Sequence, residues 1–261
     1  MFKKFLFLIS FASILFSQEI TLGVVPQQSP LELSKTWLRI TTYLRQNIGV
    51  DVIFKTEKSI SLFEEKLYNG EYDIAYMNPY HFIVANKRQN YSAFIRSKED
   101  IVGIILGNKQ KEFNINNLKD STFLFPAPNA FAATLLTKYE LKEKYNFDID
   151  KDAKVIYVNS HDSVYKGIAR GIGDLGGGIP RTFENFKDSE DKDKIGIVYK
   201  TSSYPSHPFA SHPRVNKEIV EKISKAIIEM PKELKEILSI EEFKLTTTDE
   251  YDVIKNLDIN K

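Results

Sequence analysis

The sequence contains no cysteine among its 261 residues. Disulfides, zinc–thiolate sites, thiol nucleophiles and a lipid-modified cysteine are therefore excluded. An excess of one charge is also missing, since 36 basic and 35 acidic side chains give a formal net charge of +1. The field of the whole molecule thus favours neither nucleic acid nor an anionic membrane as a partner. Any recognition of charge must be local.

Long hydrophobic runs are missing as well, apart from one stretch near the amino terminus. Lys3 and Lys4 precede an apolar run over residues 5–16, and Ser17 and Gln18 follow it. This pattern is typical of a secretory signal, and the run is shorter than the roughly 20 residues that a membrane-spanning helix needs. We therefore expect residues 1–18 to be a signal peptide and the protein to be periplasmic, with an uncleaved anchor as the alternative.

Motifs of the common enzyme classes are not found either. The histidines at positions 81, 161, 207 and 212 lack the spacing of an HExxH zinc site. The sequence has no GxSxG nucleophile elbow and no Walker phosphate loop. We expect neither catalysis nor a bound metal or cofactor.

The hydrophobic pattern predicts alternating strands and helices. Strands are expected at residues 20–25, 50–54, 72–76, 93–95, 102–106, 122–125, 155–158, 174–178 and 195–199. Helices are expected at residues 31–48, 62–68, from 79, and at 130–145, 163–170, 181–186, 215–230, 232–238 and 248–257. Such alternation is typical of βαβ units, so we expect an α/β fold with mainly parallel sheets flanked by helices.

The length predicts two lobes. About 240 residues follow the signal, which is enough for two α/β lobes of about 100 to 140 residues. We expect residues 19–105 and 200–261 to form the first lobe and residues 106–199 the second. The chain should cross between them near residues 104–108 and 197–202, and two crossings permit hinge closure. A monomer is expected.

Several strings in the chain resemble those of one family. They are PQQSP at residues 26–30, the tryptophan at 37, YDIAYMNPYHF at 72–82, FPAPNAFAAT at 125–134, SHDSVY at 160–165 and YPSHPF at 204–209. Together they are similar to the periplasmic phosphate, phosphite and phosphonate-binding proteins of ABC transporters. The resemblance implies a type II periplasmic-binding fold with the ligand held between the lobes. Loops at the carboxyl ends of parallel strands, where helices begin, would meet at such a cleft.

The resemblance is incomplete at the start of the helix expected from residue 130. Phosphonate binders carry a Ser-Thr-Ser-like run there, whereas this chain has Ala130, Phe131 and Ala132. Backbone N–H groups of Asn129, Ala130 and Phe131 remain able to hold an anion. Ile60 stands where phosphonate binders have a cleft tyrosine. These departures leave open a different or more apolar ligand.

Three charged or polar side chains of the second half are candidate ligand contacts. His161 matches the family's histidine at a helix start and can donate to an anionic oxygen. Arg181 stands where aminophosphonate binders place an acidic residue, and a guanidinium fits carboxylate or phosphoryl oxygens. His207 replaces an aspartate, which removes a partner for an amine. For His161 and Arg181 the alternative is a solvated side chain at a helix start.

In the first lobe, Gln28, Asn78 and Tyr80 are the candidates, because they follow strands expected to end at the cleft. The predicted function is capture of a small anionic ligand, either a phosphonate, phosphite or phosphate-like oxyanion or another small acid. The partner would be the membrane permease of an ABC importer. The alternative is a sensory module that presents its ligand-bound form to a histidine kinase or chemoreceptor.

Overall fold

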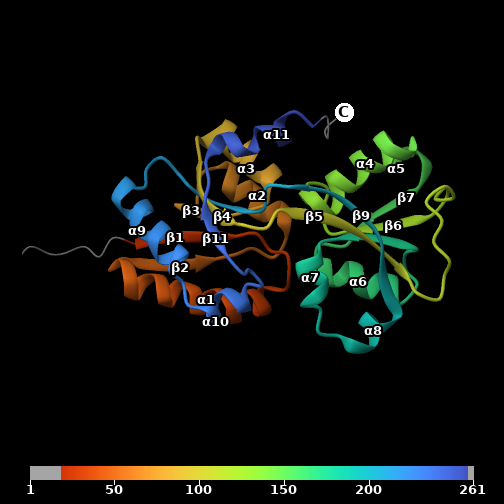
Figure 1. Ribbon diagram of the computed structural model, residues 1–261, viewed down its shortest axis with the longest axis horizontal. Coiled ribbons are helices and arrows are strands. Elements are labelled where there is room, and N and C mark those ends of the chain that lie inside the picture. Colours follow the sequence, from red (N-terminus) through yellow and green to blue (C-terminus); the bar gives the residue numbers. More distant parts are fainter. Residues whose placement is uncertain (1–18, 258–261) are drawn as a thin grey trace, which may run out of the picture.

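The computed structural model describes residues 19–257. The apolar run expected to form the signal lies outside this range. Two β-sheets, each flanked by helices, form two lobes that lie side by side along the long axis of the molecule (Figure 1). Within the described part of the chain, no helix is long and apolar enough to cross a membrane.

The first lobe is built on a six-stranded sheet with the strand order β11-β4-β10-β3-β1-β2. Its strands are β1 (Glu19–Val24), β2 (Asp51–Lys55), β3 (Ile74–Tyr76), β4 (Ser92–Ser97), β10 (Pro208–Ser211) and β11 (Phe243–Leu245). Its helices are α1 (Pro30–Ile48), α2 (Ile60–Tyr68), α3 (Pro79–Gln89), α9 (Lys217–Ile228), α10 (Lys232–Ile237), the 3-10 turn η2 (Thr248–Tyr251) and α11 (Asp252–Lys255). Helices α1, α9 and α10 contribute to one apolar core of this lobe, and α2, α3 and α11 to the other.

The second lobe is built on a five-stranded sheet with the order β7-β6-β8-β5-β9. Its strands are β5 (Ile101–Asn108), β6 (Thr122–Phe125), β7 (Lys154–Tyr157), β8 (Leu175–Gly178) and β9 (Ile195–Tyr204). Its helices are the π-helical turn η1 (Phe131–Leu135), α4 (Leu136–Tyr145), α5 (Ile149–Asp152), α6 (His161–Ala169), α7 (Pro180–Glu184) and α8 (Ser189–Lys194). The helix expected over residues 130–145 therefore begins with a π-helical turn.

The helix starts that face the other lobe are set by local sequence. Ser29 caps α1 by accepting a hydrogen bond from the Glu32 backbone N–H, and Pro30 occupies the first turn, where its missing N–H costs nothing. Asn78 caps α3 in the same way, and Ser160 caps α6. These caps fix the loops that follow β1, β3 and β7, and so position the side chains at the cleft.

Both sheets are mixed, which corrects the expectation of mainly parallel sheets. In the first sheet β2, β1 and β3 are parallel, whereas β10 pairs antiparallel with both β3 and β4. In the second, β7, β6 and β8 are parallel, and β5 is antiparallel to β8 and β9. The antiparallel pairs arise where the chain enters or leaves a lobe, so a run of βαβ units does not reveal them.

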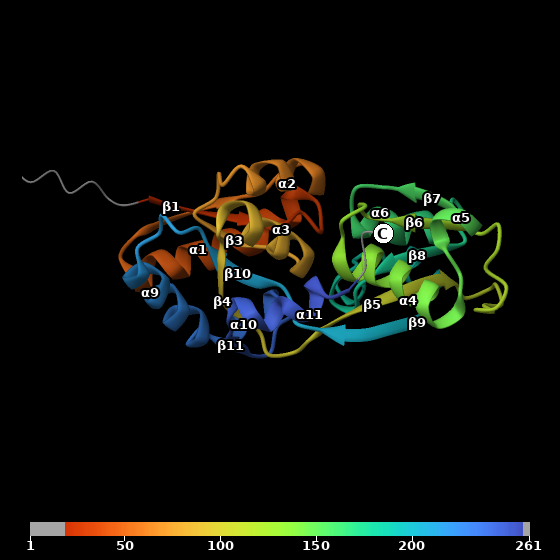
Figure 2. The same cartoon turned by 90° about the horizontal axis from the view of Figure 1, so that it is seen from above.

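The chain passes between the lobes twice, at residues 98–100 and 205–207 (Figure 2). Strands β5 and β9 pair along almost their whole length, from Ile101 opposite Tyr204 to Asn108 opposite Ile195. The crossings expected near 104–108 and 197–202 therefore lie inside the second sheet. A division of the lobes at residues 105 and 200 stays a proposal, and the pairing favours placing it a few residues closer to 98 and 205.

Candidate ligand-binding cleft

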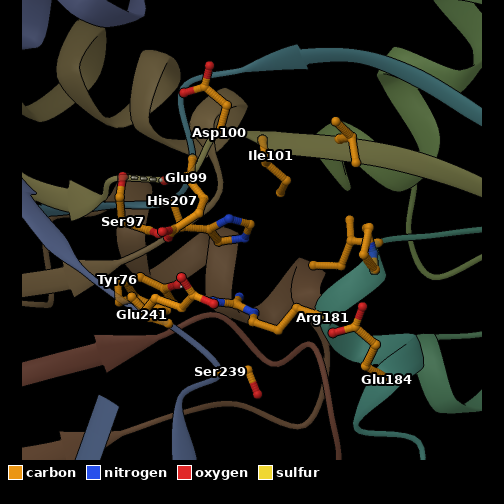
Figure 3. Close-up of a pocket in the computed structure, with 15 residues that line it drawn as sticks. Tyr76, Ser97, Glu99, Asp100, Ile101, Arg181, Glu184, His207, Ser239 and Glu241 are labelled. Carbon is orange, nitrogen blue, oxygen red and sulfur yellow. Dashed lines mark hydrogen bonds between the residues drawn. The ribbon is translucent and has the colours of Figure 1, made fainter. Parts of the chain in front are cut away.

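Arg181 reaches from the second lobe to the first. It belongs to α7, which begins directly after β8, and its guanidinium donates to the Tyr76 hydroxyl at 2.7 Å and to Gln27 Oε1 at 2.9 Å. Gln27 follows β1, and Tyr76 is the last residue of β3. The Gln27 amide nitrogen in turn lies 3.2 Å from His207 Nε2. Figure 3 shows the Arg181 side chain extending toward Tyr76, with the His207 ring beside the same cavity.

The guanidinium of Arg181 has no carboxylate within 4.0 Å in the described part of the chain, although it is partly buried. Its hydrogen-bond partners are neutral, and it uses only part of the five donors of a guanidinium. A cation that is shielded from water and lacks a counter-ion attracts an anion more strongly than a solvated one does. The arrangement therefore favours an anionic ligand between the lobes.

The two histidines of the cleft are neutral near pH 7. Burial, and to a lesser extent the nearby charge of Arg181, lowers the pKa of His161 to about 3. Burial and Arg181 likewise hold the pKa of His207 well below its usual value. His161 Nδ1 lies 3.2 Å from the Thr182 hydroxyl. Each imidazole can therefore donate one hydrogen bond to a ligand but brings no positive charge.

Other contacts hold the lobes against each other. The His161 backbone N–H donates to the Gln27 carbonyl at 3.3 Å, and the Asn78 side-chain amide donates to the Asn129 carbonyl at 3.0 Å. At the rim, Lys187 pairs with Glu32 at 2.6 Å. Since each contact joins residues of opposite lobes, the structure represents a closed arrangement.

Three hollows adjoin the buried polar contacts between the lobes, and a fourth, of about 380 Å³, lies at the rim between Glu32 of the first lobe and Asp162 and Lys187 of the second. The first of the three, which we call the outer cavity, has a volume of about 280 Å³. It is lined by Tyr76, Ser97, Glu99, Asp100, Ile101, Val102, Ile179, Pro180, Arg181, Glu184, Ser206, His207, Ser239, Ile240 and Glu241. A second hollow of about 50 Å³ lies between Trp37, Gln27 and Arg181. The third, the inner pocket, has about 10 Å³ and lies at the start of η1, lined by Ala130, Phe131, His161 and Asn78 among others.

The structure brings most of the predicted site residues to this boundary. Arg181 and His207 line the outer cavity, while Asn78, Ala130, Phe131, His161 and His207 line the inner pocket. Gln28 lines only the 50 Å³ hollow and the rim, and Asn129 contributes its carbonyl to the contact with Asn78. Tyr80 packs against the apolar core beside α2 and α3 and is not among the residues that line these three hollows.

Sequence reasoning missed the partners of Arg181. Gln27, not Gln28, makes the contacts to Arg181 and His207, and Tyr76 completes them. Gln27 and Gln28 are adjacent polar residues after a strand, so the pattern alone does not say which of them points into the cleft. Tyr76 ends a buried strand, where an aromatic residue is as typical of the core as of a site. No group of three or more potential metal ligands occurs in residues 19–257.

Two α/β lobes, two crossings and a polar cleft between the lobes define a type II periplasmic-binding protein. A model of the family described as "ABC transporter, phosphonate, periplasmic substrate-binding protein" matches residues 22–251. The chain therefore belongs to this family of periplasmic substrate-binding proteins.

Individual relatives agree with the family assignment. The phosphate-import protein PhnD of Mycolicibacterium smegmatis is 24% identical over 235 residues, which are 80% of this chain and 70% of that protein. A binding protein component of an ABC phosphonate transporter from Pseudomonas aeruginosa has a TM-score of 0.84 at 17% identity, covering 93% of this chain and 86% of that chain. PhnD1 from Prochlorococcus marinus in complex with methylphosphonate also reaches 0.84, at 15% identity, covering 92% and 97% of the two chains. The two solved structures show the fold.

Proposed function

We propose that the protein captures a small anionic ligand between its lobes in the periplasm and presents the closed form to the permease of an ABC importer. The unpaired guanidinium of Arg181, held between the lobes by Tyr76 and Gln27, is the observation that carries this proposal. A ligand that contacts both lobes binds the closed state more tightly than the open one and shifts the population toward it. The family and its relatives support the same role.

Both lobes contribute side chains to ligand binding. Tyr76 and His207 present polar groups to the outer cavity from the first lobe, and Arg181 presents its guanidinium from the second. Because only Arg181 is charged among these three, it supplies the attraction for an anion. The others supply hydrogen bonds that fix its orientation.

A thermal-shift screen of the full chain tests the proposal. Phosphate, phosphite, methylphosphonate, carboxylates and sulfonates are added separately, and a true ligand at 100 times its Kd stabilises the protein by about 2.7 kcal/mol. Arg181→Gln should weaken the binding by about 1.5–3 kcal/mol, since it removes a charge-assisted hydrogen bond. Arg88→Gln is the matched control, because Arg88 is exposed on α3 and stacks over the Tyr68 ring away from the cleft.

Two results would contradict the proposal: no anion raises the melting temperature, or Arg181→Gln binds the same anion as tightly as Arg88→Gln does. The sensory role uses the same closure and differs only in the partner. Membrane vesicles that hold an ABC permease should retain the ligand-loaded protein. Retention only by a sensor kinase or chemoreceptor would favour the sensory role.

A further inference from the structure

The hollows of the cleft differ in the room that they leave for a ligand. A cavity needs on the order of 10–15 Å³ to hold one water molecule. The inner pocket, at about 10 Å³, has room for one water at most, whereas the outer cavity has about 280 Å³. A tetrahedral oxyanion therefore does not fit the inner pocket of the closed protein, and an organic molecule fits the outer cavity.

Phe131 is the reason that the inner pocket is small. The first turn of a helix leaves backbone N–H groups without partners, and such groups attract anions. At the start of η1, however, Phe131 is 1% exposed and packs into the same apolar core as Val25 and Ile60 of the first lobe. Its ring also meets Tyr204 edge-on, with the centroids 5.9 Å apart. An apolar ring thus occupies the space next to these N–H groups.

One positively charged side chain and several carboxylates line the outer cavity. Arg181 is its only basic lining residue, and the imidazole of His207 is neutral. Glu99, Asp100, Glu184 and Glu241 also line it. One of these carboxylates has a counter-ion, since Asp100 pairs with Arg96 at 3.0 Å. Glu99 accepts a hydrogen bond from the neutral Ser97 hydroxyl and keeps its negative charge.

Three carboxylates of the cavity have no counter-ion. Glu99, Glu184 and Glu241 form no ion pair within residues 19–257. The positive charge of Arg181 balances the charge of a ligand that carries one negative charge. A second negative charge would meet these carboxylates without a counter-charge and would be repelled.

The walls of the outer cavity are largely apolar. Ile101 and Val102 come from β5, Ile179 precedes α7, and Ile240 follows α10. Ligand cavities commonly combine such walls with a few polar groups that fix the orientation. The body of the ligand should therefore be apolar.

We infer that the ligand is a monocarboxylic acid with an apolar body, bound in the outer cavity, and that Phe131 and the acidic rim exclude doubly charged oxyanions. This inference rests on the proposed function and names its substrate class. The carboxylate of the ligand accepts hydrogen bonds from the remaining guanidinium N–H groups of Arg181. The apolar part of the ligand lies against Ile101, Ile179 and Ile240. The charged group of the ligand is thus held at α7 and not at the start of η1.

Calorimetric titration of the full chain with four probes at pH 8 tests the inference. Hexanoate and adipate share a six-carbon chain and differ by one carboxylate, and phosphate and methylphosphonate represent the tetrahedral anions. We expect hexanoate to bind at least about tenfold more tightly than the other three. The double variant Glu184→Gln, Glu241→Gln should strengthen adipate binding by about fivefold and leave hexanoate within about twofold, because it reduces the repulsion and keeps the Arg181 contact.

Phe131→Ala tests whether the Phe131 ring keeps anions out of the inner pocket. The variant should bind phosphate or methylphosphonate, which the wild type does not, because the substitution exposes the backbone N–H groups of η1. Phe123→Ala is the control, since Phe123 is equally buried on β6 in a different core and its loss opens no space at the cleft. If Phe131→Ala does not fold, Phe131→Leu with its smaller side chain should show the same gain to a lesser degree.

The outcomes separate this inference from the proposed function. Phosphate or methylphosphonate binding to the wild type as tightly as hexanoate overturns the inference and leaves the proposed function intact. The same holds if neither Phe131 variant gains binding of these anions. A failure of all four probes to bind the wild type contradicts both.

Discussion

The His161 imidazole is enclosed between α6, α7 and the loop after β1, and burial lowers its pKa to about 3. The pKa of His207 is lowered for the same reason. In the unfolded chain both histidines titrate near their ordinary pKa of about 6.5. Below that pH the unfolded state binds protons that the folded state does not. The stability that these histidines contribute is therefore complete above about pH 6.5 and is lost as the pH falls toward their folded pKa values.

We predict that the unfolding free energy of the wild type falls between pH 7.5 and 5.5, by up to about 1.4 kcal/mol per pH unit for each of the two histidines below pH 6.5. Urea titrations at several pH values measure this slope. His161→Gln removes one titrating group, so its slope should be shallower by up to about 1.4 kcal/mol per pH unit, while His207 and His212, whose pKa values are also lowered, keep the rest. A flat wild-type profile in this range would show that the imidazoles are not enclosed.

At the scale of single residues, the sequence predicts the charge of the site but not its partners. Arg181 and His161 could be singled out because they stand at expected helix starts where the resembled family places cleft residues. Gln27 could not be separated from Gln28, because the loop after β1 has no repeating pattern that fixes which side chain points inward. Tyr76 could not be predicted as a site residue, because an aromatic residue at the end of a buried strand is as typical of the core as of a site.

At the scale of elements, Gly177 of β8 and Gly103 of β5 allow η1 to lie on the sheet. A Cβ added at Gly177 would overlap the Ala133 carbonyl oxygen and the Phe125 ring, and one added at Gly103 of β5 would overlap the Ala132 carbonyl oxygen. The backbone of η1 therefore lies directly on two strands. A glycine permits close approach of a ligand or of another backbone segment, and here the start of a helix approaches.

Gly177→Ala should destabilise the protein by about 1–3 kcal/mol or more, because neither the strand nor η1 can move without breaking other contacts. Gly196→Ala on β9 is the control, since its Cβ would meet only the flexible Lys109 side chain at 3.3 Å. Denaturant midpoints of both variants measure the difference. Equal midpoints would mean that η1 does not lie on β8 as described.

The elements that periodicity misses are short. β10 has four residues and β11 has three, and neither is long enough to display an alternating pattern. Yet β10 lies in the middle of the first sheet, where Pro208 is tolerated as the first residue of the strand. The long amphipathic helix α1 and the strands β1, β2 and β6 could be predicted because their patterns extend over more residues or alternate clearly with helices.

At the scale of the whole molecule, the two-lobe architecture followed from length and alternation, and the structure and the family confirm it. The position of the crossings did not follow, because a strand that leaves one lobe has the same pattern whichever sheet it joins. Some contacts between the lobes are polar, with Arg181, Asn78 and Lys187 each bonded to the opposite lobe, and others are apolar, since Phe131 packs into the core of the first lobe. Water competes for the polar contacts, and a ligand that binds both lobes adds to the stability of the closed form.

Small-angle X-ray scattering of the full chain tests closure around a ligand most directly. The anion that gives the largest thermal shift is added to saturation, and the curve is compared with that of the free protein. The account predicts a smaller radius of gyration with the anion, with a curve that matches the closed lobes described above, and no such change in Arg181→Gln. Superimposable curves with and without a bound anion would contradict it.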